Sequence, residues 1–187
     1  MKYHDITKND MLNGDGLRVV LWTAGCEHHC KDCQNPITWD PDDGLPFDEA
    51  AKQEIFEQLD KSYISGITFS GGDPLHPASF PSVYALAKEI REKYPDKTIW
   101  LYTGYTWEEI LRSKNWILRH VDVLVDGRFQ VDQKDNRLMW KGSSNQRVID
   151  VQATLKQSDL TVPVLHCEDF MSDEPFDMIP AKTSCRM

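Results

Sequence analysis

Three cysteines, Cys26, Cys30 and Cys33, are separated by three and two intervening residues and closely follow an apolar run over residues 17–24. Such a run predicts a buried strand that ends at this loop. Thiolates are the usual ligands of iron–sulfur clusters, and this spacing lets three of them converge on one small inorganic group. Three local cysteines would leave one iron of a 4Fe–4S cluster without a protein ligand. An open coordination position is typical of catalytic rather than structural metal sites.

Zinc is a second candidate for the same stretch. A zinc site of the Cys3His type, completed by His28 or His29, fits the spacing because zinc accepts mixed thiolate and imidazole ligands. The spacing favours a cluster over zinc, and either of them over a loop without metal. We expect the histidines to be solvated or packed rather than catalytic. The distant Cys167 and Cys185 lack partners at ligand spacing. We expect Cys167 to be a small buried side chain and Cys185 to be a free thiol.

The composition is that of a soluble globular protein, with 40 % hydrophobic and 27 % charged residues among 187. This length predicts one domain with a sizeable core. The chain shows neither an apolar run of membrane-spanning length nor a signal peptide, so we expect a cytoplasmic protein whose thiols stay reduced. The net charge of −9 argues against nucleic acid as the main partner, because binding phosphates requires clustered lysine and arginine.

Apolar patterns alternate along the chain between predicted strands and predicted amphipathic helices. The strands are expected at residues 17–24, 64–70, 98–103 and 121–125, and the helices at 47–61, 80–94 and 107–111. Continuous apolar strands that alternate with helices are typical of a parallel sheet covered by helices. These units are too few for a closed eight-stranded barrel. We therefore predict an α/β fold, a partial open (βα) barrel with mostly parallel strands.

Glycine and polar residues follow each predicted strand. Functional groups in parallel architectures gather at the C-terminal ends of the strands, so we expect these residues to meet over one mouth. After the cysteine loop they are Gly71-Gly72-Asp73, Tyr102-Thr103-Gly104 and Asp126-Gly127. Taken alone, the Gly-Gly-Asp-Pro stretch and Asp126 are also ordinary turn residues. Beside a cysteine loop, the glycines can let the backbone approach a ligand, and Asp126 can face it.

Together these motifs resemble a known family. The cysteine spacing with a Gly-Gly-Asp turn after the next strand resembles the radical S-adenosylmethionine enzymes. Five stretches make the chain similar, within that superfamily, to the activating enzymes of anaerobic ribonucleoside-triphosphate reductases, and these are residues 13–18, 70–75, 102–105, 122–127 and 142–147. The resemblance covers residues 1–170, the expected radical S-adenosylmethionine domain. We expect a poorly ordered tail over residues 171–187.

The resemblance implies a 4Fe–4S cluster on Cys26, Cys30 and Cys33, with S-adenosylmethionine bound at the open iron. In the family, the Gly-Gly-Asp turn holds the methionine ammonium, and backbone near the third cysteine contacts adenine. The residues implied to contact S-adenosylmethionine are Asp32, Cys33, Gln34, Gly71, Gly72, Asp73, Thr103 and Asp126. The sequence assigns a catalytic role to no single side chain.

The implied activity is that of an oxidoreductase. It cleaves S-adenosylmethionine reductively to methionine and a 5′-deoxyadenosyl radical, which removes a hydrogen atom from a glycine of the large reductase subunit. The implied partners are that subunit and a small electron-donor protein such as flavodoxin. Alternatives are another small radical S-adenosylmethionine enzyme, or a non-enzymatic zinc or electron-transfer module.

Three residues depart from the family pattern. Asp32 stands before the third cysteine, where many members carry an aromatic residue, so adenine stacking there is left open. Asp15 replaces a common proline, and Arg128 a common proline or lysine. The polar stretch 142–147 is either a solvated turn or a rim that docks the reductase through Asn145 and Arg147. A guanidinium suits such an anchor because it donates several hydrogen bonds at once.

Overall fold

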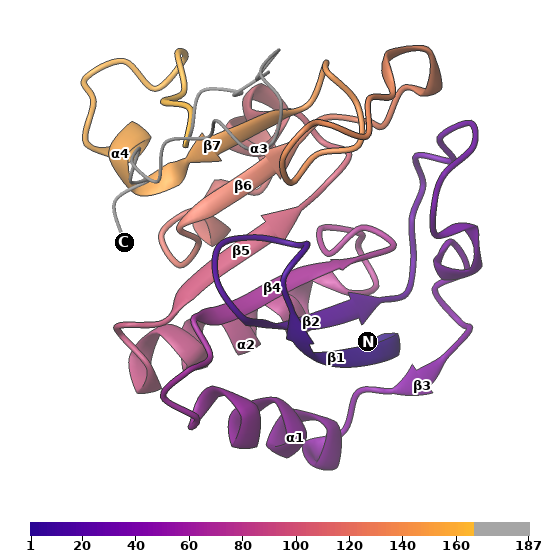
Figure 1. Ribbon diagram of the computed structural model, residues 1–187, viewed down its shortest axis with the longest axis vertical. Helices are drawn as coiled ribbons and strands as arrows, with labels where there is room; N and C mark the ends of the chain where they lie inside the picture. Colours follow the sequence, from indigo (N-terminus) through magenta and orange to yellow (C-terminus); the bar gives the residue numbers. More distant parts are fainter. Residues whose placement is uncertain (167–187) are drawn as a thin grey trace, which may run out of the picture.

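The central strands of the sheet are parallel. The structure, a computed structural model, describes residues 1–166, and within them one seven-stranded sheet has the order β3-β1-β2-β4-β5-β6-β7 (Figure 1). The parallel strands are β2 (Arg18–Thr23), β4 (Gly66–Gly71), β5 (Thr98–Tyr102) and β6 (Val123–Asp126). This part of the sheet does not close on itself. The predicted α/β class and its open, mostly parallel centre are confirmed.

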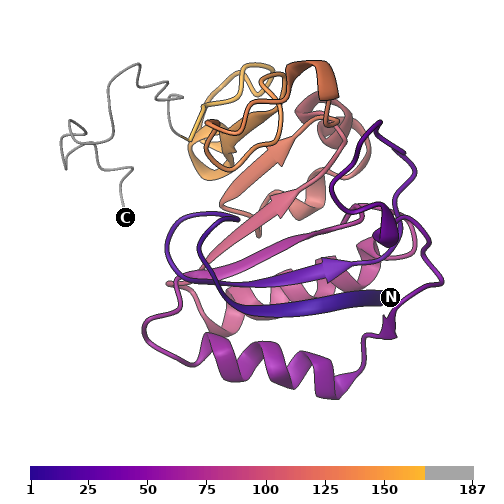
Figure 2. The ribbon, with the colours of Figure 1, turned by 45° about the vertical axis from the view of Figure 1, so that its right-hand side comes forward.

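Helices cover one face of this sheet. They are α1 (Glu49–Leu59), α2 (Phe80–Lys93), α3 (Trp107–Ser113) and α4 (Val151–Leu155), with short 3-10 turns at η1 (Pro36–Thr38), η2 (Asn115–Ile117) and η3 (Val131–Gln133). Figure 2 shows α1 and α2 lying along the same side of the strands. Their apolar stripes, such as Ile55 and Ile90, share one core with alternate strand residues such as Leu21 and Phe69. The predicted helices lie where their periodicity placed them.

The other sheet face carries a smaller apolar cluster. Trp100, Val123, Val125 and Val148 pack there, with Tyr102 and Trp140 beside them. Arg18, expected within an apolar run, is fully buried at the edge of this face, with its guanidinium 5.4 Å from the centre of the Trp100 ring. It donates to Thr68 Oγ1 at 2.9 Å, the Ile67 carbonyl at 2.7 Å and the Thr98 carbonyl at 2.9 Å. Burial lowers its pKa to about 10. Arg18 thereby ties three parallel strands together.

Three antiparallel strands flank the parallel centre, with β3 and β7 at the two edges of the sheet, and their positions were not predicted beyond an expected further strand or two after residue 125. β1 (Lys2–Asp10) pairs with β2, β3 (Leu45–Pro46) pairs with β1, and β7 (Arg147–Asp150) pairs with β6. Within β1 only Ile6 is buried, so a strand at this edge lacks the apolar run that identifies a central strand. The stretch 142–147, expected to be a turn or rim, therefore leads into a strand.

Some expectations fall outside residues 1–166. They concern the end of the predicted domain at residue 170, the tail over 171–187, and Cys167 and Cys185. For the part of the chain that is described, no helix combines the length and the apolar character needed to cross a membrane.

Candidate functional site

Loops that follow the four parallel strands surround one cavity of about 200 Å³. Residues at or after the C-terminal end of each parallel strand line it. They are Cys26, His28, Cys30, Cys33, Gln34 and Asn35 after β2, Ser70, Gly71 and Gly72 at the end of β4, Tyr102, Thr103 and Gly104 at the end of β5, and Gly127 and Phe129 after β6. Asn13, Trp22, Gly142 and Gln146 complete the wall. The four strand ends thus meet over one mouth, as the sequence predicts.

The three motif cysteines are free, half-buried thiols that share this cavity. Burial raises the pKa of Cys26 to about 11 and also raises the pKa of Cys30. Such thiols stay protonated at neutral pH until a metal displaces the proton. Their positions around a shared space, rather than around one point, fit a multi-atom cluster of iron and sulfide. Within residues 1–166, no three His, Cys, Asp or Glu side chains are grouped to hold a single metal ion.

Both histidines of the cysteine loop have other contacts. His28 Nε2 lies 2.7 Å from Asp73 Oδ2, and the two side chains are almost fully buried. Because a carboxylate only accepts, His28 Nε2 is the donor. The His29 ring packs edge-on against Trp39, with the ring centres 4.8 Å apart. The sequence predicts histidines that are solvated or packed, and His28 is packed. The sequence does not indicate that its partner is the aspartate of the Gly-Gly-Asp turn.

Gly71 and Gly72 line the cavity, but the closest atoms to a Cβ at either position would be backbone atoms of neighbouring segments. Gly71 has φ +104°, which favours glycine, and a Cβ there would lie 2.6 Å from the backbone nitrogen and oxygen of Thr23. A Cβ on Gly72 would collide with the carbonyl oxygen of Gly25 and lie 2.7 Å from that of Thr38. The two glycines therefore let the β4 end pack tightly against the start of the cysteine loop.

The other residues expected at the S-adenosylmethionine site divide into two groups. Gln34 and Thr103 line the cavity, while Asp32, Asp73 and Asp126 do not. Asp32 is exposed and has φ +56°. Asp73 is 1 % exposed, and its carboxylate accepts from neighbouring protein groups. The sequence places Asp73 and Asp126 at strand ends, but the side chains of both are bonded to other groups of the protein.

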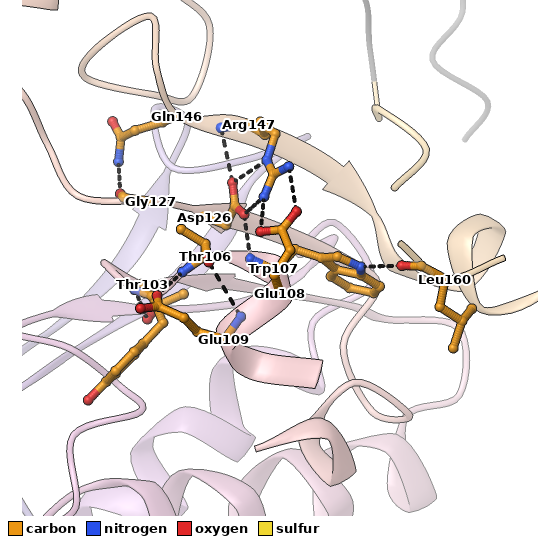
Figure 3. Close-up of polar contacts among 11 residues, drawn as sticks. Thr103, Thr106, Trp107, Glu108, Glu109, Asp126, Gly127, Gln146, Arg147 and Leu160 are labelled. Atoms are coloured by element: carbon orange, nitrogen blue, oxygen red, sulfur yellow. Dashed lines mark hydrogen bonds and ion pairs between the residues drawn. The ribbon is translucent and has the colours of Figure 1, made fainter. Parts of the chain in front are cut away.

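Asp126 belongs to a separate polar cluster, drawn in Figure 3. Its carboxylate accepts from the backbone amide of Trp107 at 2.7 Å, at the N-terminus of α3, and from Arg147 Nε at 3.1 Å and Nη2 at 2.5 Å. Arg147 also donates to both oxygens of Glu108, each at 3.0 Å. This bonding lowers the pKa of Glu108 to about 2 and raises that of Arg147. Arg147, expected as a partner anchor, is thus occupied by two carboxylates of its own chain.

A second cavity of about 490 Å³ lies over this cluster. Gly104 and Gly127 line both cavities, so the two are adjacent. Its walls include Glu108, Asp126, Asn145 and Arg147, together with the exposed Glu109, Arg128 and Gln130. The Asn145 amide donates to the carbonyl of Arg128 at 2.8 Å. Both residues expected to bind a partner therefore border one hollow beside the thiols.

Comparison with known proteins is decisive. Residues 12–149, which include all three cysteines, match the family model of the 4Fe-4S single cluster domain. The anaerobic ribonucleoside-triphosphate reductase-activating protein of Escherichia coli K12 is 42 % identical over 150 residues, 79 % of this chain and 97 % of the relative.

The chain belongs to the family of anaerobic ribonucleoside-triphosphate reductase-activating proteins.

Activating proteins of this family are similar to the chain across distant sources. The Vibrio cholerae protein is 41 % identical over 148 residues, covering 78 % of this chain and 96 % of the relative. The protein of enterobacteria phage T4 is 40 % identical over 148 residues, covering 79 % and 93 %. These alignments support, over 148 to 150 residues, the resemblance that was inferred from short motifs.

Several lining residues of this activating-protein chain were not selected from its sequence. Asn13 and Trp22 precede the cysteine motif, whereas Phe129 and Gln146 lie beyond the last parallel strand. Gln146 holds the loop from Gly127 by donating to that residue's carbonyl at 2.9 Å (Figure 3). The position of Asn13 in the family-like stretch 13–18 was a usable signal. Gln146 had the same kind of signal, because it lies in the family-like stretch 142–147. Phe129 had none, because its approach depends on how the chain returns after β6.

Proposed function

We propose that this protein is the activase of an anaerobic ribonucleoside-triphosphate reductase and acts as a radical S-adenosylmethionine enzyme. One observation carries the proposal: three free thiols, the Gly71–Gly72 turn and Thr103 share a single cavity at parallel strand ends. Membership of the activating-protein family supports the choice of target, since the relatives are named for that reductase.

Cys26, Cys30 and Cys33 would hold a 4Fe–4S cluster. When bound and reduced, the cluster would supply the one electron needed to split S-adenosylmethionine into methionine and a 5′-deoxyadenosyl radical, which would take a hydrogen atom from a glycine of the large reductase subunit. A small electron-donor protein such as flavodoxin would return the electron. The protein's own contribution is to bind, orient and shield these groups.

The cavity wall suits this task. Gly71, Gly72, Gln34 and Thr103 would contact S-adenosylmethionine, with the exposed backbone of the glycine turn and the polar side chains supplying hydrogen bonds. Trp22, Tyr102 and Phe129 contribute aromatic surface to the same cavity. Aromatic walls exclude water, which would otherwise react with a radical or weaken polar contacts.

The second cavity is the proposed docking place of the reductase segment that carries the glycine. It adjoins the first cavity at Gly104 and Gly127, so a segment lying there reaches the S-adenosylmethionine site. Asn145 and Arg147 border it. Arg147 would act by keeping Glu108 and Asp126 in place as well as by direct contact, because its guanidinium is already shared between them.

Electron paramagnetic resonance tests the proposal. The protein is reconstituted anaerobically with iron and sulfide, reduced, and mixed with S-adenosylmethionine and the large reductase subunit. We expect a glycyl radical on the subunit and methionine in comparable amount. Methionine without a glycyl radical would indicate a different target, and a protein that binds zinc but not iron and sulfide would overturn the proposal.

A further inference from the structure

The carboxylate of Asp73 already carries as many hydrogen bonds as it can accept. It receives His28 Nε2 at 2.7 Å, Thr103 Oγ1 at 2.9 Å, the Gly104 amide at 3.0 Å and the Leu75 amide at 2.8 Å. A carboxylate offers about four acceptor positions. The side chain is also buried away from the cavity lining. An ammonium group could bind it only by displacing one of these donors.

Those bonds join three of the loops around the cavity. Leu75 follows β4, Thr103 and Gly104 follow β5, and His28 lies inside the cysteine loop after β2. The backbone amide of Asp73 adds a further bond, to the carbonyl of Gly25 at 2.7 Å. Asp73 therefore holds the cysteine loop at two points, Gly25 and His28. Cys26 lies between those points.

The His28 side chain is held in place by the residues packed around it. Its side chain is 5 % exposed, and its ring meets the Tyr105 ring edge-on with the centres 4.7 Å apart. A Cβ on Gly104 would collide with the His28 ring, so only glycine leaves the required space. The Thr103-Gly104-Tyr105 stretch thus supplies a donor to Asp73, room for His28 and a packing surface for its ring.

We propose that Asp73 and His28 are positioning residues of the cluster site, which fix Cys26 relative to the cavity, and that the Asp73 carboxylate does not bind the amino group of S-adenosylmethionine. The inference rests on the proposed function, because it assumes a cluster on the three cysteines. It assigns His28 a role through the donor at Nε2. Groups that bond directly to a metal ligand and orient it are worth about 10-fold or more in metal affinity, and we use the lower end of that range because Asp73 and His28 act through the backbone of the cysteine loop.

The test compares variants of His28 and its neighbour in the anaerobically loaded protein. His28→Leu removes the donor, whereas His28→Gln keeps an N–H group at the distance of Nε2. His29→Asn is the matched control, because His29 is exposed, lies in the same loop and has φ +46°, which asparagine tolerates. The measurements are the rate of iron release to a ferrous chelator, the resonance spectrum of the reduced cluster, and the melting temperature of the metal-free protein.

We expect His28→Leu to release iron about 10-fold faster than wild type, with an altered cluster spectrum. His28→Gln should return close to wild type, and His29→Asn should match it. Recovery in His28→Gln separates positioning from a general loss of packing. If His28→Leu melts below wild type without metal, Thr103→Val removes a donor from the same carboxylate and should also accelerate iron release. Release at the wild-type rate in both variants would overturn the inference.

Asp73→Asn distinguishes positioning from ligand binding. Positioning predicts faster iron release even without S-adenosylmethionine. A direct bond to the ligand's amino group predicts normal iron release with weakened S-adenosylmethionine binding, and that result would refute the inference. Failure of the proposed function looks different, because wild type itself would then retain no iron and sulfide.

Discussion

Two buried aspartates of this protein invite comparison. Asp73 and Asp126 are each 1 % exposed, each lie at the end of a parallel strand, and each accept from backbone amides and from one basic side chain. For Asp73 the basic partner is His28 of the cysteine loop, whereas for Asp126 it is Arg147 at the start of β7. The first aspartate supports the loop that carries the thiols. The second joins α3 and β7 under the neighbouring cavity.

The difference shows that the partner determines what a strand-end carboxylate does. Asp73 turns back toward the loop of the preceding strand, and its bonds connect segments that wall the thiol cavity. Asp126 faces the first turn of α3, where its negative charge suits the helix N-terminus, and it neutralises a guanidinium. Loss of Asp73 should therefore alter the cofactor site, while loss of Asp126 should alter stability and the second cavity.

The largest expected effect is the loss of the cluster when one of the three thiols in the first cavity is removed. Cys30→Ala should abolish cluster binding, because the chain offers no described thiol to replace it at that wall. Iron and sulfide analysis after anaerobic loading measures this, and Cys167→Ala is the control that should load normally. Unchanged iron and sulfide in Cys30→Ala would show that Cys30 is not a cluster ligand, and Asp73 would then have no cofactor site to support.

Asp126→Asn should destabilise the protein without affecting cluster retention. Arg147 and the Trp107 amide lose a charged acceptor, and breaking a buried ion pair costs roughly 3–5 kcal/mol. Because the Arg147 side chain is 33 % exposed, we expect about 2 kcal/mol. Urea unfolding of the metal-free protein measures the change, with the exposed Asp132→Asn as control. Normal stability with lost S-adenosylmethionine binding would instead place Asp126 at the ligand.

Arg147→Ala tests the role of the second cavity. We expect the variant to keep the cluster and to release methionine when reduced artificially, but to yield about 10-fold less glycyl radical, a loss of roughly 1.4 kcal/mol in productive docking. The measurement is radical on the large subunit beside methionine formed without it. If both fall, Arg147 supports the cofactor site; if neither falls, residues 142–147 do not dock the reductase.

The smallest effect is a pH dependence on the Asp126 side. The hydrogen bonds from Arg147 depress the pKa of Glu108 from 4.5 to about 2. A carboxyl with a depressed folded pKa stabilises the protein above its unfolded pKa and loses that contribution as pH falls through the folded value. Glu108 is 45 % exposed, so solvent screening leaves about 0.5 kcal/mol.

Glu108→Gln should therefore be slightly less stable than wild type at pH 7. The difference should shrink between about pH 4.5 and pH 2 and should also shrink in about 1 M salt, where charges are screened within a few ångströms. Urea unfolding at a series of pH values measures it. A difference that is independent of pH would mean that Glu108 acts through packing rather than through its charge.

The features that follow from local sequence pattern could be predicted before the structure was known. The cysteine spacing indicated the thiol site, and the apolar runs with intervening helical periodicity predicted the parallel strands and α1 to α3. Because parallel strands place their C-terminal ends together, the sequence also predicted that four loops meet over one cavity. Each of these conclusions follows from residues that are neighbours along the chain or from a general rule of architecture.

The antiparallel strands and the partners of the buried polar groups depend on contacts between distant parts of the chain. β1 buries only Ile6 and β7 only two residues, so neither strand has the apolar run that identifies a strand in the sequence. Both form because they pair with a neighbouring strand, which satisfies their backbone hydrogen bonds. His28 and Asp73 are 45 residues apart, and Asp126 and Arg147 are 21 apart. A buried carboxylate must be hydrogen-bonded, but it accepts from whichever donors the fold brings within reach. The spacing of neighbouring residues does not indicate those donors, so the partners of Asp73 and Asp126 could be identified only from the folded structure.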